Sequence, residues 1–228
     1  MRTTPASQIP LSYVVGLVPV AAALNIVGSS INTALGLPTF LDMIGTAVVA
    51  IVLGPWWGGL VGLITNIGGA LILGPVGIPF ALVNVAGALV WGYGVRSFGM
   101  GASALRFFVL NIIVALVTST VAAPIVTLVF GGATGHPSDA LTAVFVNAGQ
   151  GLFTAVLASN ILVTLADKTI SGFVALSIIE TLPPSLTRGI RLPAPTGMQP
   201  ILLAVAGVVL GVGFLLVYLL VVKPLLPA

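Results

Sequence analysis

The chain has 228 residues, of which 58% are hydrophobic and only 5% are charged, and its formal net charge is +3. A water-soluble domain has about 25% charged residues, so this composition excludes a soluble globular protein. Cysteine is absent, which excludes a disulfide framework. Long stretches without a charged residue, such as 43–95 and 107–135, predict an integral membrane protein.

The membrane-spanning elements are predicted to be helices. Backbone groups in lipid need internal hydrogen-bond partners, so only helices and closed barrels cross a bilayer. Barrel strands would alternate polar and apolar residues over about ten positions, whereas these stretches are apolar on all faces. The predicted fold is therefore an all-α membrane protein: a six-helix bundle, a C-terminal cytoplasmic segment and a seventh transmembrane helix.

Gly/Pro-rich turns separate the first six predicted spans. The apolar stretch that starts at residue 12 is too long for a removable signal peptide. "GPWWG" at 54–58 and "GPVGIP" at 74–79 are typical turn sequences. The second and third spans are short for a bilayer that needs about 20 residues. In chain order, the spans are predicted over 12–33, 41–54, 58–73, 79–95, 106–130 and 140–166.

The chain changes character after residue 166, where charged residues and prolines become frequent. Segment 167–199 is too charged to span, and we predict a cytoplasmic segment with an amphipathic surface helix followed by a Pro-rich linker. Segment 200–228 contains an apolar stretch long enough to cross the membrane alone. The predicted regions are the six-helix bundle over 1–166, the cytoplasmic segment over 167–199 and the extra helix over 200–228.

The basic residues predict the orientation, because cytoplasmic loops of membrane proteins are enriched in lysine and arginine. With the N-terminus inside, only Lys223 falls outside. We therefore predict a multi-pass protein of the cell membrane with a cytoplasmic N-terminus, an extracytoplasmic C-terminus and loops 34–42, 74–79 and 131–139 on the outer face. The basic residues assigned to the inside are Arg2, Arg96, Arg106, Lys168, Arg188 and Arg191.

Amide side chains and one carboxylate gather in the outer half of the predicted bundle. Amides both donate and accept hydrogen bonds, so this set suits a neutral, hydrogen-bonding small molecule. Asn in membrane helices also bonds neighbouring helices, an alternative that stays open for each residue. Asp42 is predicted to cap the second span and to face the cavity. Asn111 and Asn160 are assigned to helix packing, and His136 to a solvated loop.

The sequence contains none of the patterns expected of an enzyme. There is no phosphate-binding Walker motif, no metal-ligand spacing and no Ser/His/Asp constellation. No charge is predicted to be buried within a span as part of a proton relay. We expect no catalysis, no cofactor, no metal and no energy source within the chain itself.

One stretch carries a resemblance to a known family. "LPTFLDMIGTAVVAIVLGPWWGGLVGLITNIGG" at 37–69 is similar to the second and third helices of the substrate-binding S components of energy-coupling-factor (ECF) transporters. The resemblance covers about 12–166. It implies binding of a vitamin or similar micronutrient in a pocket open to the outside, and docking on an ECF coupling membrane subunit that sits on two cytoplasmic ATPase subunits.

The resemblance also implies which residues form the site. Ser12 and Gly16 stand where the family often has an alanine pair facing the coupling subunit. Metal-transporting relatives begin Met-His, whereas this chain begins Met-Arg, so nickel and cobalt are not expected. Residues 167–228 have no counterpart in an ordinary S component. The residues expected to bind substrate are Asn32, Phe40, Asp42, Asn66, Asn84, Asn147 and Gln150.

Two other functions stay open. In the first, the protein is a sensing or scaffold module: a ligand or lipid binds the same outer cavity, and 167–198 docks a cytoplasmic partner. In the second, it is a small autonomous channel or permease. That role needs a polar path across the inner half of the bundle, for which only Asn25, Asn111 and Asn160 are available.

Overall fold

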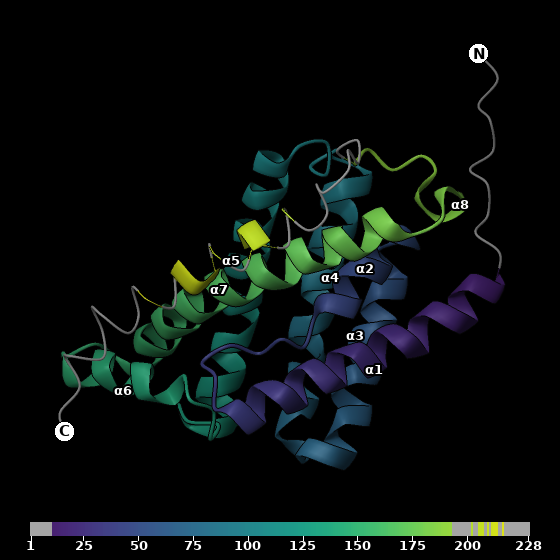
Figure 1. Ribbon diagram of the computed structural model, residues 1–228. Helices are drawn as coiled ribbons and strands as arrows, with labels where there is room; N and C mark the ends of the chain where they lie inside the picture. Colours follow the sequence, from purple (N-terminus) through teal and green to yellow (C-terminus); the bar gives the residue numbers. More distant parts are fainter. Residues whose placement is uncertain are drawn as a thin grey trace.

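The computed structural model describes residues 11–192 together with residues 202, 205–207, 209, 211–213 and 216. Over these residues the secondary structure is helical, with no strand, which confirms the all-α prediction (Figure 1). The elements are α1 (Leu11–Leu35), α2 (Ile44–Val52), α3 (Pro55–Leu73), the 3-10 helix η1 (Pro75–Phe80), α4 (Ala81–Arg96), α5 (Ala104–Phe130), α6 (Asp139–Asn147), α7 (Leu152–Thr181) and α8 (Pro184–Thr187).

Five helical segments are long and apolar enough to cross a membrane: α1, α3, η1 with α4, α5 and α7. By contrast, α2 and α6 have nine residues each, and about 14 Å of helix cannot cross a hydrocarbon core of about 30 Å. The second predicted span is thus too short to cross alone. All of its residues from Gly45 to Val52 are buried, and α2 contacts α1, α3, α4 and α7.

The helices are arranged so that two ends of the bundle differ in character (Figure 1). Loops 36–43, 74–80 and 131–151 gather at one end, which we call the loop end. Arg96 lies at the other end, where its guanidinium donates to the carbonyls of Ile51 and Val52 at 3.1 and 3.0 Å. Loop 97–103 and residues 188–192 also lie there, because a Cβ on Gly101 would be 2.7 Å from the Arg191 carbonyl oxygen. We call this the basic end; its position in the cytoplasm remains a prediction.

The predicted sixth span differs most from the structure. Residues 140–166 belong to two helices, α6 and α7, with a break at 148–151. Helix α7 does not end at residue 166 but continues to Thr181, and it has 30 residues in all. Asp167 and Lys168 therefore lie in its middle, with 0% and 1% of their surfaces exposed. The prediction that these two residues begin a segment outside the bundle was wrong, because the two opposite charges pair with each other inside it.

The described part of the predicted seventh span lies against α7. Residues 202, 205–207, 209, 211–213 and 216 are helical. A Cβ on Gly207 would be 2.3 Å from the Phe173 Cβ, and one on Gly211 would be 2.2 Å from the Ile170 Cγ1. Glycines spaced by four allow this close approach of two helices. Residues 193–200 and 217–228, which include Lys223, and residues 1–10, which include Arg2, lie outside the described residues.

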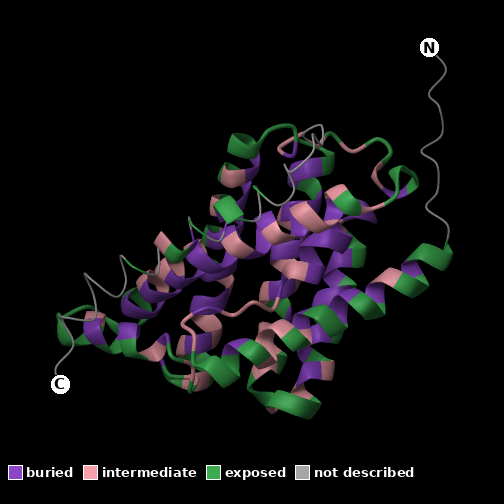
Figure 2. Cartoon of the chain, in the orientation of Figure 1, coloured by how far each residue is buried: buried purple, intermediate pink, exposed green. Residues whose placement is uncertain are grey.

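The buried residues form a core around α2 (Figure 2). Val49, Ile51 and Val52 of α2 are fully buried, as is Trp91 of α4. The Trp91 indole N–H donates to Asn111 Oδ1 at 2.8 Å, which confirms the helix-packing role of Asn111. A closely packed core therefore separates the loop end from the basic end.

Gly45 allows α2 to touch the backbone of α1, and we expect Gly45→Ala to destabilise the bundle. A Cβ there would be 2.1 Å from the Ala21 carbonyl oxygen and 2.8 Å from the Ala21 Cα, neither of which can rotate away. Overpacking of this kind costs about 1–3 kcal/mol. At Gly16, by contrast, nothing lies within 4 Å of an added Cβ. Thermal unfolding of the purified protein should show a lower Tm for Gly45→Ala and no loss for the matched Gly16→Ala; equal Tm values would contradict this packing.

Candidate functional site

A cavity of about 450 Å³ lies at the loop end. Ligand sites for small molecules usually measure about 300–1,000 Å³. We call it the loop-end cavity. Its wall combines residues from α1, α3, α5 and α7 with the three loops that gather there. The polar and charged side chains that matter below are Asn32, Asp42, Asn66, His136, Asn160 and Lys168.

Three charged side chains meet at the cavity wall, and we call Asp42, Asp167 and Lys168 the triad. The Lys168 ammonium pairs closely with Asp167 Oδ2 and lies 3.6 Å from Asp42 Oδ1. The Lys168 and Asp167 side chains are 2% and 0% exposed, whereas that of Asp42 is 25% exposed. Buried charges persist only when they are paired. One cation between two carboxylates leaves a net charge of −1 when all three are ionised.

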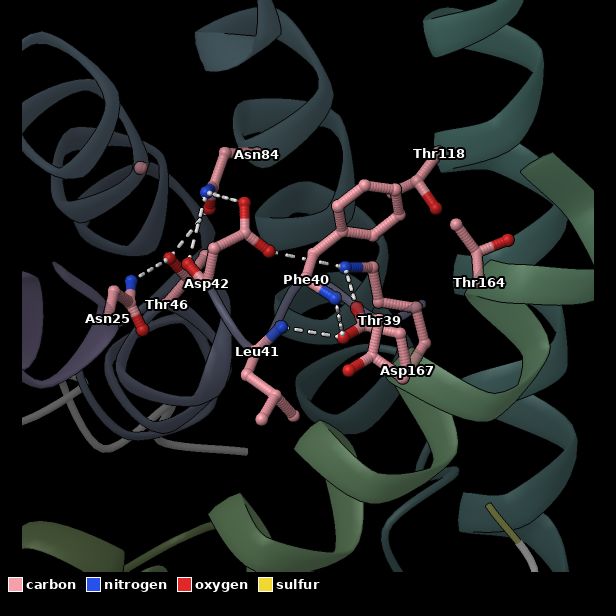
Figure 3. Close-up of polar contacts among 12 residues, drawn as sticks. Asn25, Thr39, Phe40, Leu41, Asp42, Thr46, Asn84, Thr118, Thr164 and Asp167 are labelled. Atoms are coloured by element: carbon pink, nitrogen blue, oxygen red, sulfur yellow. Dashed lines mark hydrogen bonds and ion pairs between the residues drawn. The ribbon is translucent and has the colours of Figure 1, made fainter. Parts of the chain in front are cut away.

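Asp167 also fixes the loop that carries Asp42. Its Oδ1 accepts hydrogen bonds from the backbone N–H groups of Phe40 and Leu41 at 2.9 and 2.8 Å (Figure 3). Leu41 has φ +51°, in the left-handed region that leucine rarely occupies. Such a conformation persists only when the surroundings hold it. Asp167 on α7 therefore positions Phe40 and Asp42 on the cavity wall.

A chain of buried side-chain hydrogen bonds links α1, α2 and α4 and ends at Asp42. Thr46 Oγ1 donates to Asn84 Oδ1 at 2.7 Å and accepts from Asn25 Nδ2 at 2.9 Å. Asn84 Nδ2 in turn lies 3.3 Å from the Asp42 carbonyl oxygen and 3.5 Å from its Oδ2 (Figure 3). Asn25 Nδ2 also reaches Thr65 Oγ1 at 3.0 Å. These amides and hydroxyls are satisfied by one another.

The predicted helix cap at Asp42 was wrong, although Asp42 does face the cavity as predicted. Helix α2 begins two residues later, its N-cap is Met43, and no side chain of the cap accepts a helix N–H. Instead, the Gly45 N–H donates to Asn25 Oδ1 of α1 at 2.7 Å. An amide from a neighbouring helix thus replaces the local cap and leaves the Asp42 carboxylate free for the cavity.

His136 joins two loops over the cavity and is not the solvated loop residue that was predicted. Its ring stacks on Phe40 with centroids 4.6 Å apart, and its Nε2 lies 2.9 Å from the Thr39 carbonyl oxygen. The Ser138 backbone N–H donates to Nδ1 at 3.2 Å, so the proton of the neutral ring belongs on Nε2. Burial lowers the pKa of His136, outweighing the raising effects of the Thr39 carbonyl and Asp139. The imidazole is therefore neutral at pH 7.

The structure brings four of the seven predicted site residues to the cavity: Asn32, Phe40, Asp42 and Asn66 line it. Asn84 is buried behind Asp42. Asn147 and Gln150 are exposed at the break between α6 and α7, so their predicted place in the cavity was wrong. The prediction assumed one continuous sixth helix, whereas α6 ends at Asn147 and α7 begins at Leu152.

Several lining residues were missed or assigned elsewhere. Asn160 lines the cavity, although it was assigned to helix packing, and its Nδ2 donates to the Val156 carbonyl of its own helix at 2.9 Å. Lys168 was missed because a charged residue was taken as the end of a span. The adjacent Asp-Lys pair, followed by the apolar stretch 169–182, was the signal that could have revealed a neutralised buried pair.

The docking positions Ser12 and Gly16 are both exposed on α1. Nothing lies within 4 Å of a Cβ built on Gly16, so this face is open to a neighbour. Docking of a coupling subunit there stays a prediction.

The arrangement can bind and orient a solute, since its wall offers amide, carboxylate, ammonium and imidazole groups. Across the described part of the chain, no three His, Asp or Glu side chains gather in a way that could hold a metal ion. No protein-family model, curated protein or solved structure matches the chain. The resemblance to ECF S components therefore remains a prediction, and the function is argued from the cavity.

Proposed function

We propose that this protein is a membrane-embedded substrate-binding subunit for uptake of a vitamin or similar small organic micronutrient, powered by a separate ATPase-driven coupling module. The observation that carries the proposal is a solute-sized cavity at the loop end with polar and charged residues in its wall. Intramembrane charges are costly and are usually retained for substrate or ion handling.

The bundle is closely packed between the loop-end cavity and the basic end, and this favours a binding subunit over an open channel. Between the cavity and the basic end lie the fully buried residues of α2 and the bulky side chains of Trp91 and Phe107. The neighbouring amides Asn25 and Asn84 are already hydrogen-bonded within the protein. A bound solute would need a large rearrangement to leave on that side, which is a task for an external energy source.

The exposed small residues on α1 offer a surface on which a coupling subunit could dock and drive this rearrangement. Ser12 and Gly16 lie near the N-terminal end of α1, whose other end carries Asn32 on the cavity wall. A coupling subunit that pushes on this helix would act on the cavity through one rigid element.

Isothermal titration of the purified full chain against vitamins and nucleobases tests the proposal. We expect one compound to bind with submicromolar affinity, and vesicles to accumulate it only when the coupling subunits and ATP are added. Asn66→Leu should abolish binding, because it removes an amide from the wall, whereas the matched surface variant Gln150→Ala should bind normally. Absence of binding across the panel, or equal binding by both variants, would refute the proposal.

A second candidate is an autonomous proton-coupled carrier, which the triad favours. No buried charge was predicted within a span, yet Lys168 of α7 forms an ion pair with Asp42 at the cavity wall, and charges inside membrane helices often mark ion or proton pathways. Flux of the bound compound into liposomes that contain this chain alone, driven by a pH gradient, would select the carrier. The sensing alternative is weakened, since 167–181 belongs to a buried helix and cannot act as a free cytoplasmic relay.

A further inference from the structure

We propose that the loop-end cavity selects an organic cation whose ammonium or amidinium group pairs with the Asp42 carboxylate. The inference rests on the proposed function and refines its ligand class. It replaces the neutral, hydrogen-bonding molecule that the sequence favoured, because the triad adds charges that were not expected inside the bundle.

The charges around the cavity are predominantly negative. The triad contributes −1 when it is ionised. Asp139 adds a further carboxylate at the rim, where its Oδ2 accepts from the N–H groups of Thr134 and Gly135, two residues of the cavity wall. His136 is neutral, since Nδ1 accepts from Ser138 and Nε2 faces a carbonyl. The described arginines lie elsewhere, at the basic end or in the segments that lead to it.

Asp42 has unused capacity to bind a cation. Its Oδ1 is buried, accepts no hydrogen bond and lies 3.6 Å from the Lys168 ammonium, so the exposed part of the side chain lies elsewhere. Its Oδ2 is 3.5 Å from Asn84 Nδ2. Charge-assisted hydrogen bonds to a carboxylate measure about 2.7–2.9 Å, so neither contact satisfies this group fully. With a quarter of its side chain exposed in the cavity wall, Asp42 can accept short hydrogen bonds from a ligand.

Lys168 offers no equivalent site for an anion. Its side chain is 2% exposed, and its ammonium already pairs closely with Asp167. An anionic ligand would have to displace one of two carboxylates and would then leave that carboxylate unpaired in the bundle, which is strongly unfavourable.

Charge-selective labelling of an engineered cysteine measures this preference without knowledge of the ligand. The natural chain has no cysteine, so Ser29→Cys would place one thiol in the cavity wall. The full chain is treated with methanethiosulfonate reagents that carry trimethylammonium-ethyl, hydroxyethyl or sulfonatoethyl groups. After normalisation to their rates with a free small thiol, we expect the cationic reagent to react about tenfold or more faster than the anionic one. Ser97→Cys, exposed beside Arg96 at the basic end, should not show this preference.

Charge-neutralising variants identify the source of the preference. Asp42→Asn in the Ser29→Cys chain should reduce the ratio of cationic to anionic rates to near one, while Gln150→Ala should leave it unchanged. If Asp42→Asn does not yield a monodisperse protein, Asp139→Asn should lower the ratio by a smaller factor. Equal rates for all reagents would overturn the cation inference and leave a solute-accessible cavity in place. No reaction with any reagent would overturn the proposed function as well.

Discussion

Lys168→Met is expected to lower the free energy of unfolding by about 3–5 kcal/mol, the usual cost of removing one partner from a buried ion pair. The methionine side chain fills a similar volume but leaves Asp42 and Asp167 facing each other without a cation. Asp167 is fully buried and has no route to water. Thermal and denaturant unfolding in detergent would show the loss, together with a lower yield of monodisperse protein.

A second substitution separates lost charge balance from lost packing. In Asp167→Asn/Lys168→Met, the amide oxygen can still accept from Phe40 and Leu41, and Asp42 remains as the single, partly exposed carboxylate. This double variant should regain much of the lost stability. Arg188→Met, at the basic end, is the matched control and should change stability little, since exposed charges contribute about 0–1 kcal/mol. If the double variant is less stable than Lys168→Met, charge imbalance is not the cause.

The membrane class and the helical fold were predictable because they depend on composition. Long uncharged stretches and Gly/Pro turns mark apolar helices without any knowledge of packing. The gathering of three loops at one end followed from counting spans. Helix boundaries were less accessible: α2 is shorter than its apolar stretch, and just before it the N–H groups of Phe40 and Leu41 donate to Asp167 of α7. That contact joins positions more than a hundred residues apart, and no local pattern encodes it.

Site residues were predictable only where the local sequence around them was enough to single them out. Asn32 and Asp42 were found because an amide and a carboxylate are rare near an apolar helix end. Lys168 was missed because charge alone was used to end a span, although adjacent opposite charges can enter a bundle as a pair. Asn147 and Gln150 were misplaced because the sixth span was taken as continuous across Gly149 and Gly151, where the structure has a break between α6 and α7.

Asp167→Ala is expected to release the loop that forms the cavity wall. It removes the acceptor for the N–H groups of Phe40 and Leu41, and a residue with φ +51° has no reason to keep that conformation without it. It also leaves Lys168 with only the 3.6 Å contact to Asp42. We expect a loss of about 3–5 kcal/mol in the free energy of unfolding and faster hydrogen exchange in peptides that cover 36–43.

Asp167→Asn is the matched variant, because it removes the charge and keeps an oxygen at the same place. Exchange over 36–43 should then stay near that of the natural protein, although the Lys168 ammonium loses its closest carboxylate and overall stability falls. Peptides from α3 serve as an internal reference, since α3 makes no hydrogen bond to Asp167 among the described contacts. If both variants speed exchange equally over 36–43, the electrostatic pairing with Lys168 holds the loop. If only the alanine variant speeds exchange over 36–43, the two hydrogen bonds accepted by Asp167 keep Phe40 and Asp42 in place. The cavity wall then depends on Asp167, which is not among the residues that line the cavity.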